Sequence, residues 1–102
     1  MKIKNFTKAS MCGTSFKGTI KTTKEDLIKA LGEPTPYYGG DGKVDIDWAI
    51  LATTEEGEKV LFTVYNWKTE GVPQGLYDWH IGGTESASVL AAYELIENGV
   101  KA

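Results

Sequence analysis

Alternation of apolar and polar residues is the clearest pattern along this chain, and it predicts strands. Apolar positions recur at every second residue over 44–50, 60–64 and 76–81. A period of two is typical of strands that bury one face. Residues 54–58 read T-E-E-G-E, which predicts a hairpin turn between the first two of these strands, so they should be adjacent and antiparallel.

The N-terminal part of the chain has a weaker pattern. Phe16 and Ile20 alternate with polar residues, which predicts a further strand over 15–20 in which Gly18 marks a weak point or a close approach. Residues 1–14 have no convincing period, and we expect them to form an extended lead-in.

Helical spacing occurs twice. The first predicted helix follows a threonine cap within 22–23, carries an apolar stripe at 27, 28 and 31, and ends at Gly32. The second follows a cap at Thr84, has apolar residues at 89, 92, 93 and 96, and ends at 98–99. Residues 34–42 and 69–75 are rich in proline and glycine and are predicted loops.

This order of elements predicts a single α+β domain over 1–102. We expect a four-stranded, mainly antiparallel sheet in the order β-α-β-β-β-α, with both helices on one face. If the helices cover the face carrying Val44, Ile46, Trp48, Val60, Phe62, Val64, Tyr77, Trp79 and Ile81, these residues form the core. The other face would then carry Asp45, Asp47, Leu61, Thr63, Tyr65, Trp67, Asp78 and His80, a mixture apolar enough to bind a partner. The pattern leaves open which face is covered, because Leu61, Tyr65 and Trp67 compete with Val60, Phe62 and Val64 for burial.

Composition limits the partners and the cellular location that we expect for this protein. The 102 residues carry a net charge of −3, which gives no electrostatic reason to expect DNA or RNA as a partner. Cys12 is the only cysteine, so the chain cannot close a disulfide on itself, and a reducing cytoplasmic location is expected. No stretch is long and apolar enough to span a membrane, and no signal-peptide core is seen.

Residues 77–84 hold the densest chemistry. Gly82, Gly83 and Thr84 precede the last helix, and a glycine turn at a helix N-terminus can hold an anion with its backbone amides. His80 lies two residues earlier and titrates near neutral pH. The alternative is that the two glycines only reverse the chain and that His80 is an ordinary surface residue.

Aromatic residues at 37, 38, 65 and 67 can stack a nucleobase or anchor a protein contact, and the sequence does not separate these roles. Asp45, Asp47, Asp78 and His80 could in principle converge on a divalent metal ion. Three aspartates are also typical of a solvated sheet face, so no metal site is predicted. Catalysis would need Cys12 or Ser15 beside His80, and nothing in the sequence brings them together, so no catalytic residue is assigned.

Several segments resemble a family of small proteins encoded by tailed phages and prophages. The matching segments are G-T-S-F-K-G-T-I at 13–20, L-G-E-P at 31–34, G-K-V-D at 42–45 with Trp48, T-V-Y-N-W-K at 63–68 and D-W-H-I-G-G at 78–83. The last two are the most specific. No catalytic residues are assigned in that family, so the resemblance implies none in this chain. The resemblance implies an accessory phage protein in the bacterial cytoplasm, and such proteins often inhibit host defence.

These observations lead to one functional hypothesis and one alternative. The hypothesis is a non-enzymatic phage counter-defence protein that sequesters a nucleotide-like anion without a cofactor or metal. Its predicted ligand-binding residues are Tyr65, Trp67, Lys68, His80, Gly82, Gly83 and Thr84. The alternative is an inhibitor of a host defence protein or a homodimeric module, in which Leu61, Tyr65 and Trp67 form an apolar contact. A homo-oligomer is expected in either case, and a small phosphoester hydrolase stays a third hypothesis.

Overall fold

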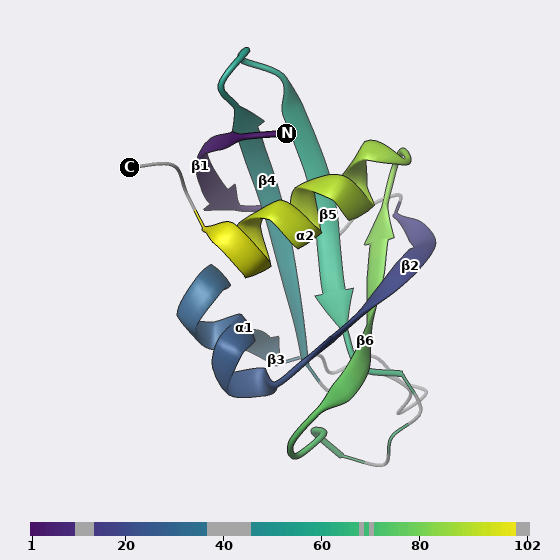
Figure 1. Cartoon of the computed structure of the whole chain (residues 1–102). Helices are drawn as coiled ribbons and strands as arrows, with labels where there is room; N and C mark the ends of the chain where they lie inside the picture. The colour runs from purple at the N-terminus through teal and green to yellow at the C-terminus, as the bar shows by residue number, and fades with distance from the viewer. Residues whose placement is uncertain (10–13, 37–45, 68, 70, 100–102) are drawn as a thin grey trace.

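The computed structural model of the chain describes residues 1–9, 14–36, 46–67, 69 and 71–99. They form an antiparallel sheet with two helices (Figure 1). The elements are β1 (Ile3–Lys8), β2 (Ser15–Thr22), α1 (Lys24–Leu31), β3 (Thr35–Pro36), β4 (Ile46–Thr54), β5 (Lys59–Tyr65), β6 (Tyr77–Gly83) and α2 (Ala87–Asn98). The predicted α+β class and the mainly antiparallel sheet are therefore confirmed.

The strands pair in the order β1-β4-β5-β6-β2, and every pair is antiparallel. The short strand β3 pairs with the first residues of β4, while β1 pairs with its last five. The predicted hairpin between β4 and β5 is confirmed: Gly57 has a φ of 91°, and its N–H donates to the Thr54 carbonyl at 2.9 Å. A positive φ is what glycine adopts without strain.

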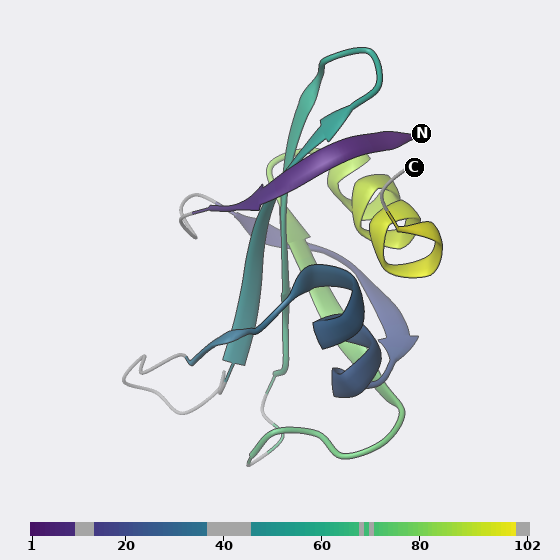
Figure 2. The same cartoon turned by 90° about the vertical axis from the view of Figure 1, so that its left-hand side faces the viewer.

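Both helices lie on the same side of the sheet (Figure 2). Helix α2 packs on β5, β6 and β2, and α1 packs on α2. The core between the layers contains Ile3, Ile20, Leu27, Leu31, Ile46, Trp48, Ile50, Ala52, Val60, Phe62, Val64, Trp79, Ile81, Ala91, Ala92 and Leu95. The helices therefore cover the face of Ile46, Val60 and Trp79, a choice that the sequence pattern left open; Val44 of that face lies outside the described residues, and Tyr77 packs at its margin.

Two buried tryptophans attach α1 to the sheet. The Trp48 indole N–H donates to the Gly32 carbonyl at 2.8 Å, and the Trp79 indole N–H donates to the Thr22 carbonyl at 3.2 Å. Their rings meet edge to face with centroids 5.5 Å apart. Because Thr22 and Gly32 flank the helix, the two indoles fix both of its ends while satisfying their own buried donors.

Helix α1 begins and ends where the sequence predicts. The Thr23 hydroxyl accepts a hydrogen bond from the Asp26 N–H at 3.1 Å, which satisfies one of the free amides of the first turn. Leu27 and Leu31 face the core, one turn apart. Gly32 ends the helix with a φ of 92° and donates its N–H to the Ile28 carbonyl.

The strand count of the prediction is wrong. Residues 3–8 form β1, which we expected to be part of an extended lead-in, and Thr35–Pro36 form β3 inside a predicted loop. In β1 the register shifts between Ile3 and Asn5, so the strand has no regular alternation for a sequence pattern to detect. A proline is tolerated in β3 because, among the described strands, it pairs on one side only, with β4.

The predicted turn at Gly82-Gly83 is also wrong, because both glycines are the last residues of β6. A Cβ built on Gly83 would lie 2.2 Å from the Ser88 Cβ, so this glycine lets α2 approach the sheet. Thr84 does not cap the helix. Ser86 occupies the N-cap position without a side-chain hydrogen bond, and α2 begins at Ala87.

Candidate functional site

The face of the sheet turned away from the helices carries a row of polar and aromatic side chains. Asp47 of β4 is paired with Tyr65 of β5, and Tyr65 is paired with His80 of β6. Residues that face each other directly in an antiparallel sheet point to the same side and have Cβ atoms about 5 Å apart. The register alone therefore places an acid, a phenol and an imidazole side by side.

Four rings gather at this row, and we call them the aromatic cluster: Phe16, Tyr65, Trp67 and His80. The His80 ring is at its centre, with centroid distances of 4.9 Å to Phe16, 5.5 Å to Tyr65 and 6.2 Å to Trp67. The Trp67 and His80 planes are within 22° of parallel, and Tyr65 meets Trp67 edge to face at 6.4 Å. These distances are typical of favourable aromatic pairs.

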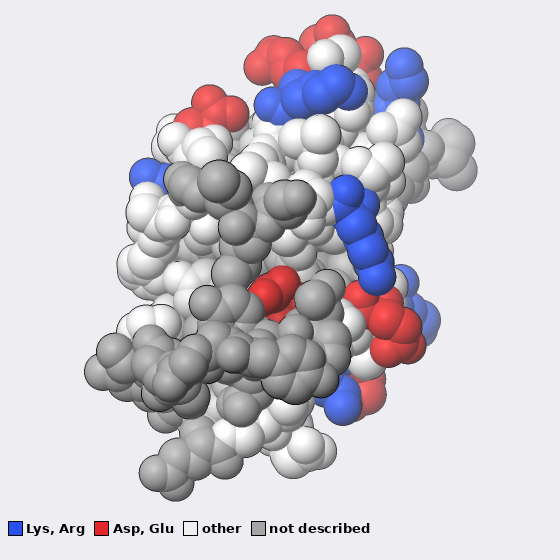
Figure 3. All heavy atoms as spheres, turned by 180° about the vertical axis from the view of Figure 1, so that it is seen from behind, with Lys and Arg blue, Asp and Glu red and all other residues white. Residues whose placement is uncertain are grey.

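Much of the cluster is accessible. Phe16 is 56% exposed and Trp67 is 39% exposed, whereas Tyr65 and His80 are partly buried between them. Seen from behind, the described part of this face has its charged side chains mainly toward one end and one edge, and a single acidic side chain is visible near its middle (Figure 3). Large exposed rings are typical of a binding surface.

Beside the cluster the sheet has a row of small residues. Thr63 lies between Ala49 of β4 and Gly82 of β6. A Cβ on Gly82 would lie 2.5 Å from the Thr63 Oγ1 and 3.4 Å from the Tyr65 Cε1, so Gly82 leaves the room that these two side chains occupy. Thr63 is fully buried, and its hydroxyl oxygen has no hydrogen-bond partner.

Several hydrogen bonds hold the backbone on both sides of the Trp67 side chain. Asn66 is fully buried, and its Oδ1 accepts from the Ile46 N–H at 3.2 Å while its Nδ2 donates to the Thr69 Oγ1 at 2.7 Å. The Tyr77 hydroxyl accepts from the Trp67 N–H at 3.2 Å and donates to the Trp67 carbonyl at 3.4 Å. The exposed indole is therefore attached to a hydrogen-bonded part of the chain, although it follows the end of β5.

Burial shifts the pKa values of the three titratable side chains in this row, Asp47, Tyr65 and His80. It raises the pKa of the Asp47 carboxyl and the pKa of the Tyr65 phenol, and it lowers the pKa of the His80 imidazole. In each case desolvation disfavours the charged form. At neutral pH His80 is therefore an uncharged ring.

The structure brings together part of the predicted site. Tyr65, Trp67 and His80 lie in one cluster, and Gly82 lies beneath Tyr65. Gly83 faces Ser88 of α2 on the other side of the sheet. Thr84 is exposed beyond the end of β6, and the predicted ligand residue Lys68 lies outside the described residues.

The glycine amides are not arranged as the sequence suggested. Gly82 is paired with Phe16 on one side and with Thr63 on the other, and Gly83 is paired with Ser15 and Phe62. The N–H groups of a strand between two neighbours point along the sheet into the ladder. They do not form an open turn at a helix N-terminus.

Sequence reasoning missed Phe16, which it placed on the same face as Ile20. A register shift between Phe16 and Gly18 moves Phe16 to the other face, where it lies opposite Gly82 and against His80. A bulge inserts one residue and so reverses the side on which every preceding side chain points. The glycine at position 18 was the only sequence signal of this irregularity.

The other candidate chemistries gain no support. Within the described residues no group of three or more His, Cys, Asp and Glu side chains is placed to hold a metal. Ser15 lies opposite Gly83, on the helix side of the sheet, whereas His80 points to the other side. Cys12, Tyr37, Tyr38 and Asp45 lie outside the described residues.

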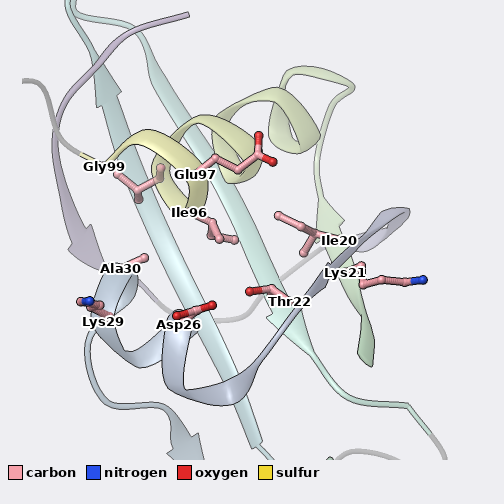
Figure 4. A pocket seen from close by; sticks show the side chains of 10 residues that line it. Ile20, Lys21, Thr22, Asp26, Lys29, Ala30, Ile96, Glu97 and Gly99 are labelled. Carbon is pink, nitrogen blue, oxygen red and sulfur yellow. The ribbon is translucent and has the colours of Figure 1, made fainter. Parts of the chain in front are cut away.

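A cleft of about 560 Å³ lies on the helix side, between β2, α1 and the end of α2. Ile20 and Ile96 line its apolar part, and Thr22 and Asp26 lie on its lower side, while Lys21 points away from its centre (Figure 4). The cleft also reaches Gly99, next to residues outside the described part of the chain.

Comparisons with known proteins add no evidence on the role of these residues. No protein-family model, no curated protein and no solved structure matches the chain. Among the described residues, neither helix has the length and apolar character needed to cross a membrane.

Proposed function

We propose that this protein is a non-enzymatic binding protein that docks a protein partner on its aromatic cluster. One observation carries this proposal: Phe16 and Trp67 are exposed beside Tyr65 and His80 on the sheet face that the helices leave uncovered. Tryptophan and tyrosine supply the largest binding energies in protein interfaces, and a cluster of this kind is the usual centre of such a contact.

The support for Trp67 strengthens the proposal. A tryptophan on a mobile loop loses conformational freedom when it binds, and that loss reduces affinity. Here the hydrogen bonds of Asn66 and Tyr77 hold the backbone before any partner arrives. The surface is therefore preorganised, which favours docking over an adaptable, weak contact.

The biological setting is a proposal from the sequence resemblance. The segments 63–68 and 78–83 resemble a family of tailed-phage proteins, and they include Tyr65, Trp67 and His80 of the aromatic cluster. In that setting the partner would be a bacterial defence protein, and the phage protein would inhibit it in the cytoplasm. This step is an analogy, and the binding surface does not depend on it.

A nucleotide is the second candidate ligand, because the rings at Tyr65, Trp67 and His80 provide faces on which a base can stack. The phosphate half of that hypothesis is less well supported. The Gly82 and Gly83 amides lie within the sheet, and burial keeps His80 neutral. Isothermal titration with cyclic and linear nucleotides tests it: binding that Trp67→Ala abolishes would make the nucleotide the preferred ligand.

Affinity capture from bacterial extract tests the leading proposal. The baits are the wild type, Trp67→Ala, Phe16→Ala and the control Leu90→Ala. Leu90 is an exposed apolar residue on α2, 61% exposed, so its removal matches the loss of apolar surface at another place. A partner retained by the wild type and the Leu90 variant, and lost with both cluster variants, supports docking on the cluster.

Equal retention by all four baits would contradict the proposal. Size-exclusion chromatography with light scattering covers the case in which the partner is a second copy of the chain. In that case the wild type is a dimer and Trp67→Asp is a monomer. A monomeric wild type that also captures no partner would count against the proposed function.

A further inference from the structure

We propose that Asp47, together with Tyr65 and Trp67, forms a subsite that accepts a cationic side chain, a guanidinium or ammonium group, of the docked protein. This inference rests on the proposed function, because it specifies what the partner presents to the face. It assigns Asp47 a binding role that the exposed rings alone do not require.

Asp47 is unusual for a carboxylate on a sheet face. It is only 5% exposed, and within the described residues no hydrogen bond or ion pair of its carboxylate is seen; its oxygens are not among the fully buried atoms without a partner, so they keep a small contact with solvent. A charged group that is largely removed from water is costly without a partner, and such groups are normally paired. A cation brought by a partner would supply the missing charge.

The neighbours of Asp47 suit a cation. Tyr65 lies directly beside it in the register, and Trp67 follows two residues later on the same side of the chain, next to the Tyr65 ring at 6.4 Å. A guanidinium or ammonium group within about 6 Å of such a ring face is attracted by its π electrons. Together with a carboxylate, the rings provide both apolar contact and charge.

The other charges on this face do not compete for Asp47. His80 is separated from it by Tyr65, and burial lowers its pKa so that the ring is neutral at neutral pH. Asp78 is exposed and lies opposite Lys21 of β2, at the far edge of the face. In the described residues the centre of this face therefore carries negative charge without a cation, which favours a positive partner group over an anion.

Nuclear magnetic resonance can test the subsite without the partner. The probe is N-acetyl-arginine methylamide, and the matched neutral control is the citrulline analogue, which has nearly the same shape and no charge. We expect the arginine probe to shift the amide signals of Tyr65 and His80 and the indole signal of Trp67. The citrulline probe should cause at most a tenth of that shift, and Asp47→Asn should weaken arginine binding about tenfold, the factor for about 1.4 kcal/mol.

A titration of the Asp47 carboxyl carbon gives an independent readout. The pKa of this carboxyl should be above its ordinary value in the free protein, because of burial, and should fall when the arginine probe binds. A pKa at or below the ordinary value in the free protein would mean that the chain itself already supplies a cation. That result, or equal shifts from both probes, would overturn the subsite.

The capture experiment separates this inference from the proposed function. Asp47→Asn is nearly isosteric, so it should fold and keep the aromatic cluster. If the partner is lost with Trp67→Ala and retained at full strength with Asp47→Asn, the cation subsite is wrong and docking on the cluster stands. If neither variant affects capture, the proposed function fails as well.

Discussion

Gly83→Ala is the change that most directly tests how the sheet and α2 fit together. A Cβ at position 83 would lie 2.1 Å from the Ser88 Oγ and 2.2 Å from the Ser88 Cβ, far inside contact distance. The Ser88 hydroxyl also donates to the Leu61 carbonyl at 2.7 Å, and moving Ser88 would break that bond. The added methyl group must therefore displace the first turn of α2.

The expected loss of stability follows from these two effects. Overpacking a filled core costs about 1–3 kcal/mol, and the lost hydrogen bond adds about 1 kcal/mol. The free energy of unfolding should fall by about 2–4 kcal/mol. For a domain of this size that corresponds to a melting temperature lower by about 8–30 °C.

Urea and thermal denaturation of matched variants measure this loss. Gly18→Ala is the control, because its Cβ would meet the Val89 Cγ2 at 3.4 Å, an ordinary contact, and an alanine in a strand loses less chain entropy than glycine. It should leave stability unchanged or raise it by up to about 1 kcal/mol. Ser88→Gly removes the clashing atoms, so the double variant Gly83→Ala/Ser88→Gly should be more stable than the sum of the single changes predicts by more than about 1 kcal/mol.

A Gly83→Ala protein within about 0.5 kcal/mol of the wild type would refute the packing argument, since a change of that size is ordinary for a surface position. Additive single changes at 83 and 88 would refute the specific contact with Ser88. Either result would reopen a role of Gly83 other than close packing.

Three further predictions concern the open face. Thr63→Val should raise the free energy of unfolding by about 1 kcal/mol, because it removes a buried hydroxyl without a partner; a loss of stability in urea denaturation would reveal a partner. Asn66→Ala should lower it by about 2–3 kcal/mol through the lost bonds to Ile46 and Thr69, and should broaden the Trp67 indole resonance; a sharp, unmoved resonance would contradict the positioning role. Burial lowers the pKa of His80 below its ordinary 6.5, so the folded state resists protonation. The contribution of this residue to the free energy of unfolding is therefore complete above pH 6.5 and is lost as the pH falls through the pKa of the folded state. Denaturation across this pH range should show the loss in the wild type and not in His80→Gln, and parallel curves would contradict it.

The elements that sequence could predict are those specified by local interactions. The α1 cap at Thr23, its end at Gly32 and the hairpin glycine at 57 each depend on residues a few positions apart. The alternation in β4 and β5 also separated the two faces of the sheet, but it did not decide which of them is buried, because Leu61, Tyr65 and Trp67 compete with Val60, Phe62 and Val64. The packing of the helices decided it, since Val60, Phe62 and Val64 lie in the core.

The candidate site was only partly predictable. Tyr65 and His80 stand on strands of regular period, so their shared face followed from the alternation, and Trp67 continues the same pattern. Phe16 did not follow, because the bulge before Gly18 reverses its side and leaves no pattern in the residue types.

The sequence by itself determined the α+β class, the two helices and the fact that Tyr65, Trp67 and His80 share one face, because near neighbours along the chain fix these features. Only the tertiary structure decided the role of Gly82 and Gly83. Those glycines are required because Thr63, Tyr65 and Ser88 occupy the space that a side chain would need, and these three residues lie on other segments of the chain. The tertiary structure also placed Asp47 next to Tyr65. That pairing depends on the register between β4 and β5, which no run of neighbouring residues specifies.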